Sequence, residues 1–184
     1  MNLAELQQQV RDGKTLDYHL FYGHYSPGTG VTSACFSQWY NKAPFRVDGI
    51  LYQTCEHYMM WRKAKLFDDG IAAAMIRACP YPDVAKQLGR DVTGFDEATW
   101  QEHRSQIVVT GNLAKFTQHE ALRDFLLQTG DAILVEASPR DRIWGIGLDA
   151  THPNAHNPLK WRGLNLLGFA LMSVRETLKA LDDF

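Results

Sequence analysis

The chain has 184 residues, of which 45% are hydrophobic and 22% charged, and its formal net charge is -2. These values are typical of one globular domain that buries a core without a disulfide or metal. The charge lacks the basic excess of proteins that bind an extended duplex, although a pocket for one or two phosphates needs only a few cations. Three cysteines without paired spacing indicate reduced thiols. With no secretory signal and no membrane-spanning run, we expect a cytoplasmic protein.

The N-terminal part predicts a short helix and strands. We expect residues 1–16 to be a helical extension, followed by a single domain over 17–184. Residues 17–22 have the aromatic, alternating character of a strand. The Asp48-Gly49 pair lies between two β-favouring runs and predicts a hairpin. A small antiparallel sheet is therefore expected in this third of the chain.

The middle of the chain predicts helices. Thr54 is placed to cap a helix that runs to Phe67 and is broken by Gly70, because the Thr54 oxygen can accept from the amides of the first turn. Asp96 is the candidate cap of a later, longer helix. The expected helices after the first cover residues 71–78, 82–89, 96–117 and 119–128.

The C-terminal part predicts one strand, a turn region and a long helix. Residues 132–136 form a short apolar strand, residues 138–147 turn and re-enter extended structure, and residues 151–163 form a loop. Steps of three and four residues predict a buried stripe on the last helix. The stripe consists of Leu164, Leu167, Leu171, Val174, Leu178 and Leu181. The fold class is α+β, mainly α-helical around a small antiparallel sheet.

The segment from Thr54 to Phe67 contains an acid and a base on one helical side. Glu56 and Lys63 lie two turns apart, about 10 Å along the axis. A ligand with an anionic end could lie between them. Alternatively, Glu56 only complements the positive end of the helix dipole, as acids in a first turn often do.

A second group of chemically active residues lies in a turn. Arg140, Asp141 and Trp144 stand beside Gly145, where the backbone can be approached closely. An arginine can bind phosphate and an aromatic ring can stack on a base. The alternative is a solvated charged turn in which Trp144 fills the core. Asn165, near the start of the last helix, could bind a sugar or base, or cap the helix.

Several familiar motifs are absent or weak. The sequence contains no nucleophile elbow, zinc-protease motif or phosphate loop. Gly145-Ile146-Gly147 lacks the third glycine of a dinucleotide-binding turn. His152 and His156 are four residues apart, but Pro153 between them argues against a shared metal-binding face.

Several blocks in collinear order resemble the NADAR, or YbiA-like, N-glycosidase family. The resemblance covers roughly residues 18–178. It is carried by CFSQWY, TCEHYMMWRKAKLF, the LGR at 88–90, GNLAKFTQHEALRDFLLQTG, LVEASPRDRIWGIGLDA and WRGLNLLGFALMSVR. Two differences from the family pattern are Ser37-Gln38-Trp39, where members often have Ser-Asn-Phe, and Trp61-Arg62, where they have Ala-Gln. Both bear on the shape of the base pocket.

The resemblance implies hydrolysis of a base-to-ribose C–N bond. Family substrates include phosphoribosyl-aminopyrimidine intermediates of riboflavin synthesis and, as another proposed class, ADP-ribosyl groups on guanine. The motif matches carry the family's acid onto Glu56 and its lysine onto Lys63. They also match Asp141, Trp144, Gly145 and Asn165.

The chemistry of this reaction suggests a role for each residue. Positive charge develops on the sugar, so Glu56 would stabilise it or activate water. Asp141 would hold ribose hydroxyls or the water. The base would stack on Trp144 and Trp39, and phosphate would meet Lys63 with Arg90 or Arg140. We expect no metal or redox cofactor and no membrane partner.

Two other functions use the same residues. The first is removal of ADP-ribose from modified guanine in nucleic acid, which requires a pocket for only one displaced nucleotide. The second is a non-catalytic module that binds NAD or ADP-ribose through Arg140, Asp141 and Trp144, with Glu56 as a dipole partner.

Overall fold

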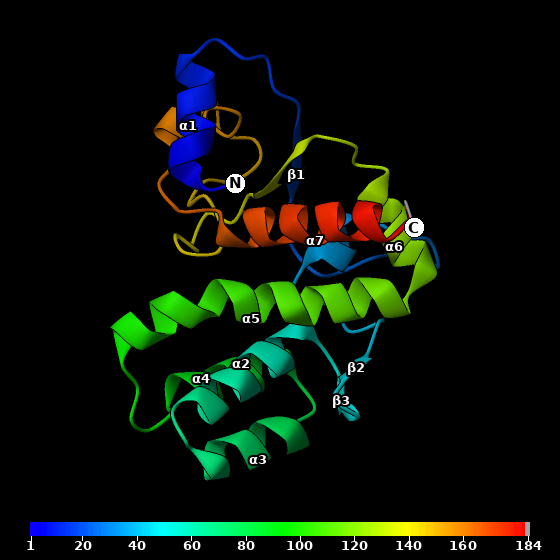
Figure 1. The fold of residues 1–184 in the computed structure, drawn as a ribbon, viewed down its shortest axis with the longest axis vertical. Helices are drawn as coiled ribbons and strands as arrows, with labels where there is room; N and C mark the ends of the chain where they lie inside the picture. The colour runs from blue at the N-terminus through cyan, green and yellow to red at the C-terminus, as the bar shows by residue number, and fades with distance from the viewer. Residues whose placement is uncertain (183–184) are drawn as a thin grey trace. The chain divides into compact units, whose positions relative to one another are not determined.

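The computed structural model describes residues 1–182, and the chain divides into two compact units (Figure 1). Unit 1 contains residues 1–36 and the chain from residue 121 onward, whereas unit 2 contains residues 37–120. Each unit has its own core, and each is described by itself.

The strand expected over 17–22 forms in unit 1, but its pairing was not expected. β1 (Tyr18–Phe21) pairs in parallel with β4 (Ile133–Glu136), with Tyr18 opposite Ile133. Parallel strands need a long connection, so local sequence patterns around 17–22 contain no signal for this partner. The 3-10 turn η1 (Ser33–Phe36) packs Phe36 edge-on against Phe21 at 5.4 Å between ring centroids.

The N-terminal helix is packed into unit 1. α1 (Leu3–Arg11) begins at a capping box in which Asn2 and Glu5 bond each other's backbone. Leu6 is fully buried, and Gln7 Nε2 donates to the Pro158 carbonyl at 3.0 Å in the turn η2 (Pro158–Lys160).

The last helix, α7 (Leu166–Asp182), confirms the centre of the predicted stripe but not its ends. Leu167, Leu171, Val174 and Leu178 are at most 3% exposed, whereas Leu164 and Leu181 are 41% and 58% exposed. Leu164 lies outside because the helix begins only after Asn165, whose backbone has a φ of 55°. Each fully buried aliphatic side chain contributes about 1.5–3 kcal/mol to folding.

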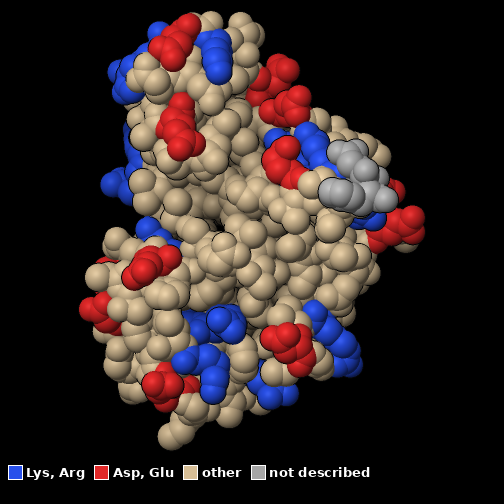
Figure 2. All heavy atoms as spheres, in the orientation of Figure 1, with Lys and Arg blue, Asp and Glu red and all other residues tan. Residues whose placement is uncertain are grey.

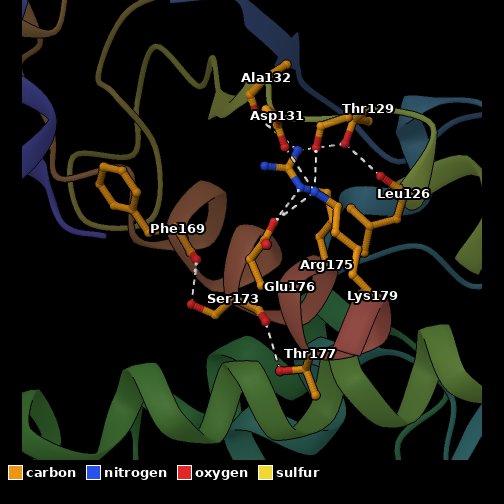
Figure 3. A network of polar contacts seen from close by, with 11 residues as sticks. Leu126, Thr129, Asp131, Ala132, Phe169, Ser173, Arg175, Glu176, Thr177 and Lys179 are labelled. Carbon is orange, nitrogen blue, oxygen red and sulfur yellow. Dashed lines mark hydrogen bonds and ion pairs between the residues drawn. The ribbon is translucent and has the colours of Figure 1, made fainter. Parts of the chain in front are cut away.

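Arg175 connects α7 to the turn that follows α6 (Glu120–Leu127) (Figure 3). Its side chain is 2% exposed, and Nη1 donates to Thr129 Oγ1 at 2.8 Å and to the Ala132 carbonyl at 2.9 Å. Lys179 lies nearby at the surface and pairs with Asp131 at 3.0 Å. The buried guanidinium therefore fixes the entry to strand β4.

Unit 2 consists of four helices and the predicted hairpin. β2 (Phe45–Val47) and β3 (Ile50–Tyr52) are antiparallel, and Asp48 and Gly49 both have positive φ, as a two-residue hairpin turn requires. The helices are α2 (Cys55–Leu66), α3 (Gly70–Ala78), α4 (Pro82–Arg90) and α5 (Glu97–Gln118). Thr54 and Asp96 cap α2 and α5 as expected. The mainly helical α+β fold class is confirmed.

Helix α2 approaches α5 closely because of one glycine. A Cβ on Gly111 would lie 2.5 Å from Cδ1 of Tyr58, too close for any real side chain. The helices can therefore pack with the Tyr58 ring on the α5 backbone.

Two local expectations were wrong. Gly70 does not end α2; the helix stops at Leu66, and Gly70 is the first residue of α3, capped by Asp69. The chain reverses at Asp68, which takes a left-handed φ of 55°. Residues 138–147 contain no second strand but a series of turns, because the Asp141 side chain bonds the backbone locally.

The distribution of surface charge and the polarity of the helices agree with the near-neutral, mixed composition of the chain. On the face drawn in Figure 2, acidic and basic side chains are interspersed. Among residues 1–182, none of the helices combines the length and the apolar character needed to cross a membrane.

Candidate functional site

Glu56 lies in the first turn of α2 and is buried. The Thr54 hydroxyl caps this turn by accepting from the His57 amide at 3.3 Å. The Glu56 amide donates to the Gln38 carbonyl at 2.9 Å, and the residue is only 3% exposed. Complementing a helix dipole requires no burial, and acidic side chains are seldom buried this deeply. The location of Glu56 therefore favours a chemical role.

A buried polar cluster surrounds the start of α2; it consists of Gln38, Cys55, Glu56, Asn112 and Lys115. All its members are at most 7% exposed. Asn112 Nδ2 donates to Gln38 Oε1 at 2.7 Å, and the Cys55 thiol donates to Asn112 Oδ1 at 3.5 Å. Lys115 hydrogen-bonds the Cys55 side chain.

Cys55 is not suited to act as a nucleophile. Burial raises the pKa of its thiol, and the charge of Glu56 raises this pKa further, while Lys115 opposes both effects. A nucleophilic cysteine needs a lowered pKa. The raised pKa of the Cys55 thiol does not meet this requirement.

Asn112 and Lys115 were not predicted from the sequence as members of this buried cluster. Both lie on α5 and are completely buried, beside Val108 and Phe116. Their helical spacing could have predicted this burial, because positions 108, 111, 112, 115 and 116 share one helical side. Polar residues within an otherwise apolar stripe indicate a buried network.

Lys63 lies two turns further along α2 and is also buried. Its Nζ donates to the Gly89 carbonyl at 2.7 Å and lies 4.2 Å from the centroid of the Phe95 ring. Burial lowers the Lys63 pKa, Glu97 opposes this shift, and Arg90 adds to it. The structure thus brings Lys63 and the predicted phosphate-binding Arg90 close together, with Arg90 exposed at the end of α4.

Trp39 follows Gln38 directly and is half-buried. The Lys86 ammonium lies 5.7 Å from the centroid of its ring, which is within cation–π range. The indole therefore lies next to both a cation and the residue that contacts Glu56.

In unit 1, Asp141 organises the turn that contains Trp144. Its Oδ1 accepts from the amides of Ile143 at 2.9 Å and Trp144 at 2.8 Å. Its own amide donates to Ser138 Oγ at 3.3 Å. Among the described residues, no hydrogen bond to the second carboxylate oxygen is found, and Asp141 is half-buried.

The same turn places three further residues in different environments: Trp144, Gly145 and Arg140. Trp144 is half-buried and not a core residue, and Arg140 is exposed. Gly145 is buried, and a Cβ there would lie 2.9 Å from the Glu136 carbonyl oxygen. Glycine is therefore required at 145 for the turn to pack on strand β4.

Asn165 connects this turn, strand β4 and helix α7. Its Oδ1 accepts from the Glu136 amide at 2.9 Å, and its Nδ2 donates to the Leu134 carbonyl at 2.9 Å. Its amide donates to the Gly145 carbonyl at 3.1 Å. Asn165 lies just before the helix, not within its first turns, and its side chain bonds the strand backbone.

Two hollows, one in each unit, are not lined by these residues. A hollow of about 600 Å³ in unit 2 is lined by Arg62 and Lys65 of α2, on other turns than Glu56. A hollow of about 610 Å³ in unit 1 is lined by Arg175 and Met172. None of the predicted site residues lines either hollow.

Comparison with known proteins gives consistent matches. The NADAR domain family matches residues 20–179. N-glycosidase R617 of Acanthamoeba polyphaga mimivirus is 40% identical over 170 residues, which cover 89% of this chain and 97% of that protein. N-glycosidase YbiA of Escherichia coli strain K12 is 36% identical over 143 residues, 78% of each chain.

A solved structure gives the same result. The NMR structure of the E. coli protein YbiA has a TM-score of 0.70 and 31% sequence identity, covering 92% of this chain and 89% of that chain. Because the family match extends over most of the sequence and relatives above 30% identity are covered for more than two thirds of their length, the chain belongs to the NADAR family.

Proposed function

We propose that this NADAR-family hydrolase cleaves the N-glycosidic bond between a base and a phosphorylated ribose, with Glu56 as its catalytic carboxylate. The names of the relatives, N-glycosidases, support the reaction class. The proposed substrates are phosphoribosylamino-pyrimidine intermediates of the riboflavin pathway. The observation that carries the proposal is the buried carboxylate of Glu56 within a polar cluster at a helix start.

The reaction is a hydrolysis that the side chains of this chain can support. The oxygen of a water forms a bond to the anomeric carbon while the C–N bond breaks and its electron pair passes to the nitrogen. Glu56 accepts a proton from the water, and the leaving nitrogen takes a proton from solvent. The carboxylate also stabilises positive charge that develops on the ribose ring.

The remaining roles follow from the environment of each residue. Lys63 and Arg90 are proposed to bind phosphate, since the Lys63 ammonium has three donors and bonds the Gly89 carbonyl with only one. Trp39 is proposed to stack on the base through its half-buried ring.

Unit 1 has proposed contact residues of its own. Asp141 is proposed to hold ribose hydroxyls or the water through the oxygen that does not bond the turn. Arg140 is proposed to meet phosphate and Trp144 to stack on a base. Gly145 and Asn165 are proposed to shape this segment through their backbone and carboxamide contacts.

The test compares wild-type protein with Glu56→Gln by mass spectrometry of the products. Each protein is mixed with the phosphoribosylamino-uracil intermediate and, separately, with an ADP-ribosyl-guanine oligonucleotide. We expect free base and ribose phosphate from the first substrate. The substitution should lower this rate by about 10²–10⁴-fold, the usual contribution of a general acid or base.

Asp83→Asn is the matched control, because Asp83 is an exposed acid in the first turn of α4. It should keep full activity. Full activity in a folded Glu56→Gln protein would refute the catalytic role. Release of ADP-ribose only from the oligonucleotide would reassign the substrate, and ADP-ribose binding without any product would indicate a binding module.

A further inference from the structure

The side-chain nitrogen of Gln38 is a buried donor without a partner. Gln38 is 7% exposed, and its Nε2 makes no hydrogen bond with any described residue. By contrast, both acceptors of Gln38 have a partner: Oε1 accepts from Asn112 Nδ2 at 2.7 Å, and the main-chain carbonyl accepts from the Glu56 amide at 2.9 Å.

The orientation of the Gln38 amide is determined by its neighbours. Asn112 Nδ2 also donates to the Val108 carbonyl at 2.9 Å, and Asn112 Oδ1 accepts from the Cys55 thiol at 3.5 Å. These two contacts identify the nitrogen of the Asn112 amide. Rotation of the Gln38 amide by 180° would place one NH₂ group against another. The unpartnered atom of Gln38 is therefore the nitrogen.

A buried donor that is left unpaired destabilises the free protein, so its retention needs an explanation. The main-chain carbonyl of Gln38 accepts from the Glu56 amide, so Gln38 belongs to the same buried polar cluster as the proposed catalytic residue. A ligand acceptor next to the reacting bond would satisfy the Gln38 donor. In N-glycoside hydrolysis the leaving base takes up the electron pair of the broken bond, and this negative charge is shared with a ring carbonyl oxygen.

We propose that Gln38 is a specificity-determining residue whose Nε2 donates to a carbonyl oxygen of the leaving base. This inference rests on the proposed function of Glu56. The donor favours bases that carry a ring carbonyl, such as a pyrimidinone or guanine. A base that presents an amino group at the same place would put one donor against another and is disfavoured.

The experiment measures kcat and KM for the phosphoribosylamino-pyrimidine substrate and for analogues in which hydrogen replaces each ring carbonyl oxygen in turn. Gln38→Glu keeps an acceptor for Asn112 but loses the donor, and Gln38→Met has a similar length without polar atoms. Both variants should lower kcat/KM for the carbonyl substrate by about 100-fold, as loss of one donor to developing charge does. For the analogue that lacks the carbonyl oxygen bound by Gln38, the kcat/KM values of wild type and variants should differ little.

A second measurement uses only the wild-type protein and keeps the proposal testable if the variants do not fold. The ¹⁵N side-chain amide resonance of Gln38 should shift when guanosine monophosphate is added, but not with 2-aminopurine riboside monophosphate, which lacks the carbonyl oxygen. Equal losses for substrate and all analogues, or an unchanged Gln38 resonance, would overturn the proposal. Activity of Glu56→Gln would instead contradict the proposed function, so the two failures are distinguishable.

Discussion

Asn165 Nδ2 donates to the carbonyl oxygen of Leu134 at 2.9 Å, so the residue directly before α7 is bonded to the middle of strand β4. The same carboxamide accepts from the Glu136 amide. Because Asn165 is completely buried, both strand groups would lose their partner if the side chain were removed.

Asn165→Ala should therefore lower the free energy of unfolding by about 2–4 kcal/mol, since each buried group left unpaired costs about 1–3 kcal/mol. Asn165→Gly should be slightly less harmful, because glycine adopts the positive φ of 55° at this position without strain. Urea denaturation measures both. Leu164→Ala, at a 41% exposed position, is the control and should change stability much less.

Arg175→Met should destabilise unit 1 more than Lys179→Met does. The Arg175 guanidinium bonds Thr129 and Ala132 from a buried position (Figure 3), and its removal leaves these acceptors without a donor. We expect a loss of about 2–3 kcal/mol. Lys179 pairs with fully exposed Asp131, and such surface pairs contribute about 0–1 kcal/mol. Similar losses in urea titrations of the two variants would contradict this difference.

The sequence contains enough information for the capped helix starts but not for the burial of polar residues. Thr54 and Asp96 cap helices through contacts within three residues, so a local pattern predicts them. The pairing of β1 with β4 joins distant segments, and no local signal specifies it. Asn112 and Lys115 were missed for a related reason: a polar residue on a helix is normally assigned to the solvent side, and only tertiary packing shows that both are buried.

His57 should make the stability of the protein fall on mild acidification. Its Nε2 faces the Cys79 carbonyl at 3.2 Å and its Nδ1 faces the Thr54 hydroxyl at 2.8 Å, a pattern that suits the neutral ring. Burial lowers the His57 pKa from its ordinary value of 6.5. Below that value the unfolded chain binds more protons than the folded chain, so stability decreases as the pH falls from 6.5 through the lowered pKa.

His57→Gln should flatten this part of the stability curve, measured as the free energy of unfolding between pH 7.5 and 5. His19, whose pKa is also lowered by burial and by Arg175, provides a second contribution. The double variant should therefore be flatter than either single variant. Parallel curves for wild type and His57→Gln would show that protonation of His57 does not limit stability.

Lys63→Met separates phosphate binding from a purely structural role. The ammonium already bonds the Gly89 carbonyl and lies over the Phe95 ring, so some loss of stability is expected in either case. If its remaining donors bind phosphate, KM for the phosphorylated substrate should rise roughly tenfold or more, because a hydrogen bond to a charged group is worth about 1.5–3 kcal/mol. KM for the same nucleoside without phosphate should not change, because the lost donors have no partner on it. Lys65→Met, at an exposed position of the same helix, is the control and should leave both values unchanged. An equal rise in KM for the two substrates would assign Lys63 to the packing of α2 against the end of α4 alone.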